Sequence, residues 1–108
     1  MPDAAILVMT QLPDRDGARA LARALLEGRL AACVTVGPPV ESMYHWRGKI
    51  ETANEHTLLI KTRAELYERV ETLIRRAHPY ELPEVVAVPF TYGYAPYFDW
   101  IAAETPAP

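Results

Sequence analysis

Continuous apolar runs alternate along the chain with segments whose apolar positions repeat at helical spacing. Residues 4–10 form the first run, which is typical of a strand buried on both faces. Asp14 follows as a predicted N-cap, and Gly28 stands where a helix commonly ends. Between them, apolar residues recur at i, i+3, i+4 and i+7: Ala18, Leu21, Ala22 and Leu25. The pattern predicts a strand followed by an amphipathic helix.

A long hairpin is predicted next. Residues 30–36 form a second apolar run, which Gly37-Pro38-Pro39 interrupts because proline cannot donate a hydrogen bond to a strand ladder. Two kinds of side chain then alternate over residues 40–46, as in a strand with two different faces. Arg47-Gly48 has the character of a hairpin turn, and residues 49–62 predict the returning strand.

The last third of the chain predicts a helix, a strand and a short final helix. Thr62 and Glu65 have the spacing of a capping box. Apolar positions follow at helical spacing, and Pro79 should end the helix near residue 77. Residues 84–92 predict the last strand, in which Pro89 indicates an edge or a bulge. Pro96 suits the first turn of a C-terminal helix.

The order of predicted elements is β-α-β-β-α-β plus the terminal helix. This order predicts an α+β protein with a ferredoxin-like fold, a long hairpin between its second and third strands, and a short C-terminal helix. The length of 108 residues favours one domain, so we expect residues 1–108 to form a single ferredoxin-like domain. Its ordered core should cover about residues 4–103, followed by a frayed tail.

Composition narrows the class of protein. The formal net charge of −3 argues against nucleic acid as a partner, because a phosphate-binding surface usually shows a basic excess. Cys33 is the single cysteine, so an intrachain disulfide is excluded and a reducing compartment fits. We find neither a signal-peptide pattern nor an apolar run long enough to span a membrane. We therefore expect a cytoplasmic protein without a membrane partner.

The tip of the predicted hairpin carries an apolar and aromatic cluster: Met43, Tyr44, Trp46 and Ile50. A two-stranded ribbon is marginal in water by itself, and exposed clusters of this kind usually mark an interface. A cyclic homo-oligomer is the simplest way to bury them. The alternative is that the strands are shorter and these side chains fold back onto their own domain.

The segment from His78 to Glu84 holds an imidazole, a phenol and two carboxylates in a loop stiffened by prolines. Such a set suits a divalent transition metal. The same residues also suit a structural role, in which His78 caps helix carbonyls and Tyr80 packs inward. Cys33 lies in an apolar strand, where a free cysteine is commonly a small buried residue.

Enzyme signatures are weak. Ser42 is the only serine and lacks the surroundings of a nucleophile elbow. The five glycines form neither a phosphate-binding loop nor a dinucleotide fingerprint, and no carboxylate pair stands out as an acid and a base. We therefore expect a protein that is not an enzyme and has no organic cofactor. Lys61, at the end of a strand, is a candidate for contact with an anion, or is simply solvated.

Five sequence blocks occur in an order that resembles the CutA divalent-cation-tolerance proteins, from about residue 6 to residue 101. The blocks are Leu30-Ala31-Ala32-Cys33-Val34, Ser42-x-Tyr44-x-Trp46-x-Gly48-Lys49-Ile50, Leu59-Ile60-Lys61-Thr62, His78-Pro79-Tyr80-Glu81-x-Pro83-Glu84 and Gly93…Tyr97…Trp100-Ile101. The resemblance implies a ferredoxin-like subunit, a homotrimer held by the long hairpins, and a role in tolerance to divalent cations, copper above all.

The resemblance also bears on the candidate sites. Cys33 and His78 match family positions, and with Glu81 they are the expected ligands of copper or another divalent cation. Met9 and Leu73 stand where some members carry further cysteines, and the loss of two thiols weakens a copper site here.

A second expectation follows from the likeness of the family's trimer to that of PII-type signalling proteins, which bind small effectors between subunits. On that analogy a small effector or an unidentified protein partner would bind in a cleft lined by several of this chain's residues: Tyr44, Trp46, Lys61, Tyr80, Glu81 and Tyr92.

Overall fold

The computed structural model describes residues 4–106 and consists of a four-stranded sheet with three α-helices. In chain order the elements are β1 (Ala5–Leu12), α1 (Arg15–Glu27), β2 (Cys33–Trp46), β3 (Lys49–Arg63), a 3-10 turn (Ala64–Leu66), α2 (Tyr67–Ala77), β4 (Val86–Pro89) and α3 (Ala95–Glu104). Within the described residues, no helix is long and apolar enough to cross a membrane.

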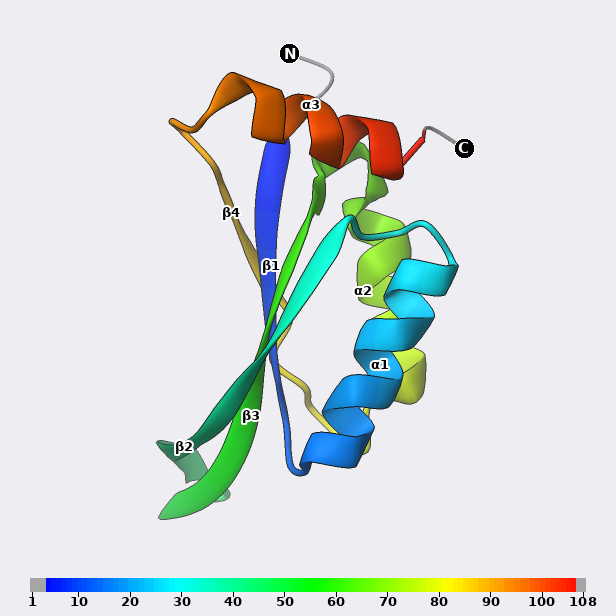
Figure 1. Ribbon diagram of the computed structural model, residues 1–108. Helices are drawn as coiled ribbons and strands as arrows, with labels where there is room; N and C mark the ends of the chain where they lie inside the picture. Colours follow the sequence, from blue (N-terminus) through cyan, green and yellow to red (C-terminus); the bar gives the residue numbers. More distant parts are fainter. Residues whose placement is uncertain (1–3, 107–108) are drawn as a thin grey trace.

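The sheet has the strand order β2-β3-β1-β4, and every neighbouring pair is antiparallel. Helices α1 and α2 lie side by side against one face, while α3 crosses the upper end of the sheet (Figure 1). β3 lies between β1 and β2, which is the split βαβ arrangement. The predicted α+β class and ferredoxin-like strand order are confirmed, as are the long hairpin and the C-terminal helix.

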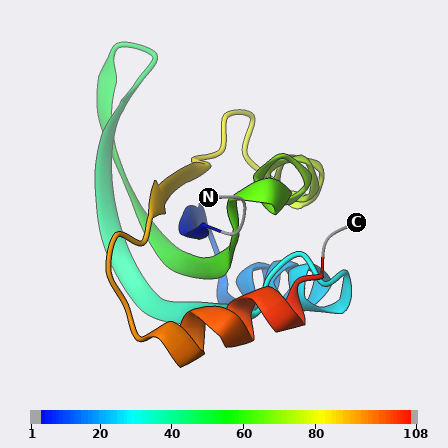
Figure 2. The ribbon, with the colours of Figure 1, turned by 90° about the horizontal axis from the view of Figure 1, so that it is seen from above.

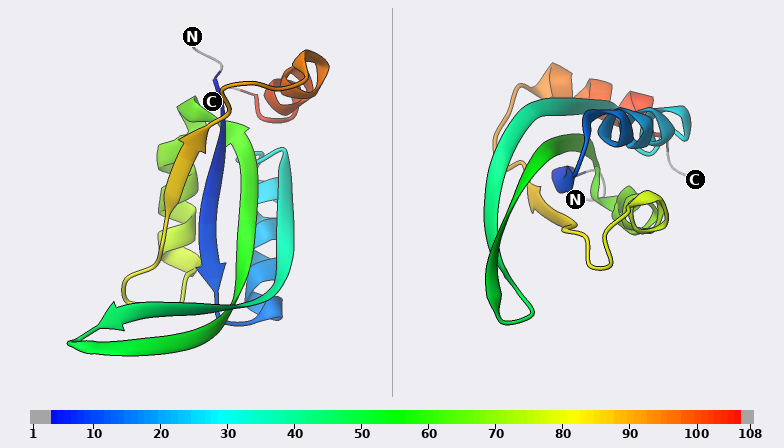
Figure 3. Two further views of the ribbon diagram at one scale, coloured as in Figure 1. Left: turned by 90° about the vertical axis from the view of Figure 1, so that its left-hand side faces the viewer. Right: turned by 90° about the horizontal axis from the view of Figure 1, so that it is seen from below.

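Strand alternation gives the sheet one covered face and one open face. Every second residue of β1, and of β3 from Leu58 to Thr62, packs under the helices. The fully buried core includes Val8, Leu25, Leu58, Ile60, Val70 and Ile74. The residues between them point to the opposite side, which none of the helices in residues 4–106 covers along most of its length (Figure 3, left). We call this side the open face; its apolar side chains are Leu7, Met9, Leu59, Val86 and Val88.

The hairpin of β2 and β3 leaves the plane of the sheet and curls over one end of the molecule (Figures 2 and 3). Its turn is at Arg47 and Gly48, whose φ angles of 51° and 80° are both positive, as a type I′ turn requires. The predicted turn is therefore confirmed. Glycine adopts a positive φ without strain, whereas Arg47 does so at a cost.

The predicted interruption at Gly37-Pro38-Pro39 is instead a bulge within one continuous strand. The pairing of β2 with β3 shifts register between Val36 and Pro39, which accommodates the prolines without ending the strand. His56 Nδ1 lies 3.1 Å from the carbonyl oxygen of Gly37 and donates to it, since a carbonyl only accepts. The ring of His56 thus fastens the bulge.

Two helix ends agree with the sequence pattern and two other boundaries do not. Asp14 caps α1 by accepting from the Gly17 amide at 2.6 Å, and Gly28 is the C-cap. The predicted capping box at Thr62 is wrong, because β3 continues to Arg63 and Thr62 is buried within it. The last strand is shorter than predicted, since only residues 86–89 pair with β1.

Candidate functional site

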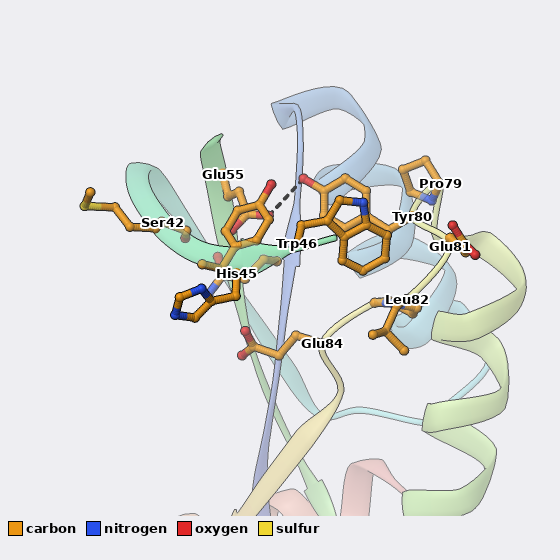
Figure 4. Close-up of a pocket in the computed structure, with 13 residues that line it drawn as sticks. Ser42, His45, Trp46, Glu55, Pro79, Tyr80, Glu81, Leu82 and Glu84 are labelled. Carbon is orange, nitrogen blue, oxygen red and sulfur yellow. Dashed lines mark hydrogen bonds between the residues drawn. The ribbon is translucent and has the colours of Figure 1, made fainter. Parts of the chain in front are cut away.

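A cleft of about 860 Å³ opens between the curled hairpin and the loop that follows α2. We call it the hairpin–loop cleft. Figure 4 shows its lining side chains, which come from one end of the sheet, from the hairpin and from the loop. They are Gln11, Ser42, Met43, Tyr44, His45, Trp46, Glu55, Pro79, Tyr80, Glu81, Leu82, Pro83 and Glu84.

His78 positions the loop side of the cleft. Helix α2 ends at Ala77, because the residue before Pro79 adopts an extended conformation, with ψ of 136° at His78. His78 Nε2 donates to the carbonyl oxygen of Gln11 at 2.6 Å, and Nδ1 accepts from the Tyr80 amide at 3.1 Å. Both ring nitrogens of this buried histidine therefore hold backbone groups, and the loop is fastened to the end of β1.

Tyr80 joins the loop to the hairpin at the base of the cleft. Its hydroxyl donates to Glu55 Oε2 at 2.8 Å, and the side chain of Glu55 is almost fully buried (6% exposed). Burial, and then the Glu55 carboxylate, raises the pKa of Tyr80 to about 12. Burial, and then the charge of Glu55, also raises the pKa of Glu84. The base of the cleft is therefore anionic and partly desolvated.

An ion pair ties the hairpin tip to the rim of the cleft. Arg47 Nη2 lies 2.9 Å from Glu81 Oε1, and both side chains are exposed. The Arg47 guanidinium also lies 5.2 Å from the centre of the Trp46 ring, within cation–π distance. An exposed pair of this kind adds little stability, but it holds the tip near the loop.

The structure divides the predicted effector-cleft residues into two groups. Tyr44, Trp46, Tyr80 and Glu81 line the hairpin–loop cleft of a single chain. The other two lie elsewhere. Lys61 is on the open face with its Nζ 5.6 Å from the centre of the Tyr97 ring, and Tyr92 is 91% exposed after β4. The two hairpin aromatics thus turn toward their own chain, whereas Met43 and Ile50 remain exposed at the tip (68% each).

The three predicted metal ligands are not brought together within one chain. Cys33 pairs with Lys61, which pairs with Leu7, whereas His78 contacts Gln11, four residues further along β1. At the rise of a strand this offset is roughly 13 Å along the sheet. Across residues 4–106, no three histidine, cysteine or acidic side chains form a group that could hold a metal ion. In a single chain these residues therefore do not fit a copper ion.

Sequence reasoning did not select Glu55 and Glu84 as site residues. Glu55 is paired with Val40 in the hairpin, where a charged side chain is expected to be exposed to solvent. It is buried because the hairpin curls over the end of the sheet. One signal was available: Glu55 has the same strand parity as Thr57 and Leu59, which places it on the side of the open face. Glu84 belonged to the candidate loop but was passed over in favour of Glu81.

Comparison with known proteins adds a family to this geometry. Residues 6–104 match the family described as CutA1 divalent ion tolerance protein. The chain is 37% identical over 99 residues to the divalent-cation tolerance protein CutA of Thermus thermophilus, covering 92% of this chain and 96% of that protein. It is 38% identical over 100 residues to the chloroplastic protein CutA of Arabidopsis thaliana, covering 93% of this chain and 55% of that protein. The chain thus spans little more than half of this plant relative.

Solved structures are similar throughout the fold. The crystal structure of CutA from Xylella fastidiosa aligns with a TM-score of 0.93 at 42% identity, covering 95% of this chain and 99% of that one. A protein from Archaeoglobus fulgidus, described as a periplasmic divalent cation tolerance protein CutA, aligns with a TM-score of 0.92 at 33% identity, covering 94% of this chain and 99% of that one.

Proposed function

Because this chain belongs to the CutA1 divalent ion tolerance protein family, we propose that it acts in the response to divalent cations, copper above all, as a homotrimeric binding protein in the cytoplasm. The family is named for tolerance of ions and not for a reaction, which supports a binding protein rather than an enzyme. The single cysteine supports a reducing compartment.

The observation that carries the assembly is the uncovered apolar surface of the chain. The open face presents Val86 and Val88 nearly half exposed, beside Leu7 and Met9 in register. Contiguous apolar surface of this kind usually marks an interface, and a cyclic arrangement of copies covers it without leaving a free edge. The exposed hairpin tip adds further uncovered apolar side chains, Met43 and Ile50, beyond the sheet.

Copper binding, if it uses Cys33, calls for ligands from more than one copy. Cys33 is half-buried at one end of the open face, beside Lys61, and far from His78 and Glu81. A thiolate is a favoured ligand for Cu(I), but a lone sulfur is not a coordination sphere. The trimer is therefore a condition of this proposal, because only the meeting of open faces brings several copies of Cys33 toward one another.

Native mass spectrometry of the purified protein during a copper titration tests both the trimer and the binding of copper. We expect a trimer that takes up a whole number of copper ions, and Cys33→Ala should abolish that uptake. His78→Ala is the companion variant, and Glu81→Gln shows whether the third predicted ligand contributes. A trimer that stays free of copper contradicts the metal part alone, whereas a monomer contradicts the assembly.

A second candidate function is effector binding, as in PII-type proteins, and the assembled hairpin–loop cleft favours it. The cleft has aromatic walls, a buried carboxylate and a volume of about 860 Å³, which is within the range of small-molecule sites. A ligand that binds only the folded protein raises its melting temperature. A ligand screen that leaves the melting temperature unchanged for every compound would count against this function, and a protein partner would then be sought by cross-linking.

A further inference from the structure

Glu55 is a buried anion whose described partner is a neutral hydroxyl. Its carboxylate accepts one hydrogen bond, from Tyr80, although an ionised carboxylate has about four acceptor sites. Among residues 4–106, no lysine, arginine or histidine forms an ion pair with it. Buried charges in proteins are normally paired, because leaving water is costly for an ion. The site therefore lacks the positive charge that its burial calls for.

A second carboxylate adds to this negative charge. Glu84 lines the same cleft as Glu55, and burial, followed by the charge of Glu55, raises the pKa of Glu84. The residues that line the cleft include no lysine and no arginine. Glu81 is the third acid of the lining, but Arg47 already neutralises it at the rim. The unbalanced charge is thus at the base of the cleft, between Glu55 and Glu84.

The walls around this charge are aromatic. Figure 4 shows the Tyr80 hydroxyl directed at Glu55, with Trp46 on the hairpin side of the cleft and Glu84 on the loop side. Tyr44 lines the same side of the hairpin as Trp46, two residues away. Aromatic faces attract cations, and the guanidinium over Trp46 shows that one ring of the cleft already accepts one. Carboxylates and aromatic faces together favour a positively charged ligand.

The shape of the site favours an organic cation over a metal ion. A metal ion needs several convergent ligands, and no group of three suitable side chains exists in the described residues. The volume of about 860 Å³ is far larger than an ion and leaves room for a carbon chain. Leu82 and Pro83 of the loop supply apolar surface for such a chain. An ammonium group also carries three N–H donors, which suit the unused oxygens of Glu55 and Glu84.

We propose that the hairpin–loop cleft binds an organic ammonium ion, with the charged nitrogen between Glu55 and Glu84 and the rings of Tyr44, Trp46 and Tyr80 around it. This inference rests on the second candidate function and names its class of ligand. It does not depend on copper binding.

Isothermal titration calorimetry with 1,4-diaminobutane tests the inference on the assembled wild-type protein at neutral pH. 1,4-Butanediol, which is neutral and of similar length, and succinate, which is anionic, are the matched ligands. We expect the diamine to bind with a Kd below about 1 mM, and neither matched ligand to bind. Equal binding of the diol, or no binding of the diamine up to several times that concentration, would overturn the inference.

Variants then locate the bound diamine. Glu55→Gln and Glu84→Gln keep the shape of the site and remove one charge each, so each should weaken diamine binding by about tenfold or more. Trp46→Leu should weaken it severalfold through the loss of a ring face. Glu41→Gln is the control, because Glu41 is exposed on β2 of the same hairpin and does not line the cleft. An unchanged affinity in Glu55→Gln, with folding confirmed by circular dichroism, contradicts the inference.

The possible results distinguish this inference from the copper proposal and from the more general proposal of effector binding. Diamine binding without copper uptake leaves it standing and removes the copper proposal. A different effector that binds the cleft, while the diamine does not, shows that the second candidate function is right and the ligand class is wrong. If the diamine fails because the ammonium of a lysine from a neighbouring copy fills the cleft, the free-ligand inference is overturned, and cross-linking with a lysine-reactive reagent identifies that lysine.

Discussion

The two ends of the sheet carry similar kinds of residue in different structural states. At the hairpin end, the polar and aromatic side chains hold one another within one chain: His78 bonds Gln11, Thr57 bonds Gln11, and Tyr80 bonds Glu55. At the opposite end, Cys33 and Lys61 lie on the open face, near exposed rings of α3. The polar side chains of the first end are held by bonds within one chain, whereas the second end belongs to the surface that the proposed trimer would cover.

This difference explains why chemical resemblance between residues is a poor guide to their role. Tyr80 and Tyr92 were both candidates for one effector cleft, yet one is fastened to a buried carboxylate and the other is 91% exposed. Convergence in space, and not residue type, marks a binding site. Four substitutions test whether the two ends differ in this way.

The largest expected effect is on assembly, from a substitution on the open face. Val88→Glu should turn the proposed trimer into monomers at micromolar concentration, because it places a charge in an apolar contact. Leu26→Glu on α1 is the matched control, since Leu26 is 40% exposed and Val88 is 44% exposed. Size-exclusion chromatography with light scattering measures both. If Val88→Glu assembles as well as Leu26→Glu does, the open face is not the interface.

The next effect concerns the fastened end. His78→Ala should lower the free energy of unfolding by about 2–4 kcal/mol, because it leaves the Gln11 carbonyl and the Tyr80 amide without their partners. His45→Ala, in an exposed hairpin position, should change it by less than about 0.5 kcal/mol. Urea unfolding of both variants gives the comparison. If His78→Ala and His45→Ala have the same free energy of unfolding, His78 does not hold the loop.

A smaller loss is expected at the other end, at Gly93. A β-carbon at Gly93 would overlap the ring of Phe98, which stacks on Phe90 with ring centres 5.9 Å apart. Gly93→Ala should therefore displace the start of α3 and lower the free energy of unfolding by about 1–3 kcal/mol. The double variant Gly93→Ala, Phe98→Leu should recover part of that loss, because the smaller side chain makes room. If the double variant is no more stable than Gly93→Ala, the loss of stability does not come from overlap with the Phe98 ring.

The smallest effect is on the pH dependence of stability. The pKa of Tyr80 is raised to about 12 in the folded protein, from about 10 when unfolded. The folded state thus holds the proton more tightly, so this contribution is fully present below about pH 10 and is lost as the pH rises toward 12. Tyr80→Phe should lack this loss. Absorbance titration should show a late-ionising tyrosine that disappears in the variant; a profile unchanged by the substitution would contradict the assignment.

Much of the fold followed from local patterns that the sequence displays. The apolar run before Asp14, the helical spacing after it and the Arg47-Gly48 turn each depend on residues close together in the chain. The wrong predictions concern the ends of strands, which are set by pairing with a neighbouring strand. Thr62 has the local character of a cap, but its place opposite Ile6 in the sheet keeps it in β3. Pairing across the sheet outweighed the local signal.

The site was predictable only in part, because its members come from three distant segments. The loop from His78 to Glu84 was recognisable from its own composition, and Tyr44 and Trp46 from the hairpin pattern. That these two aromatics face Tyr80 in the same chain, rather than only a neighbouring copy, depends on the curl of the ribbon. Cys33 and His78, both predicted as metal ligands, do not meet within the chain, because the register of β1, β2 and β3 keeps them apart.

The order of strands and helices, the position of the hairpin turn and the family resemblance could all be predicted from the amino-acid sequence. They depend on side-chain periodicity, on turn conformations and on blocks of adjacent residues. Three other features became known from the folded chain alone: the burial of Glu55, the two hydrogen bonds of the His78 ring, and the separation of the candidate residues between two ends of one sheet. Whether a side chain is buried, and which side chains come together, depends on segments that are distant in the sequence. The strand register and the curvature of the hairpin therefore had to be known before the carboxylates of the cleft could be identified.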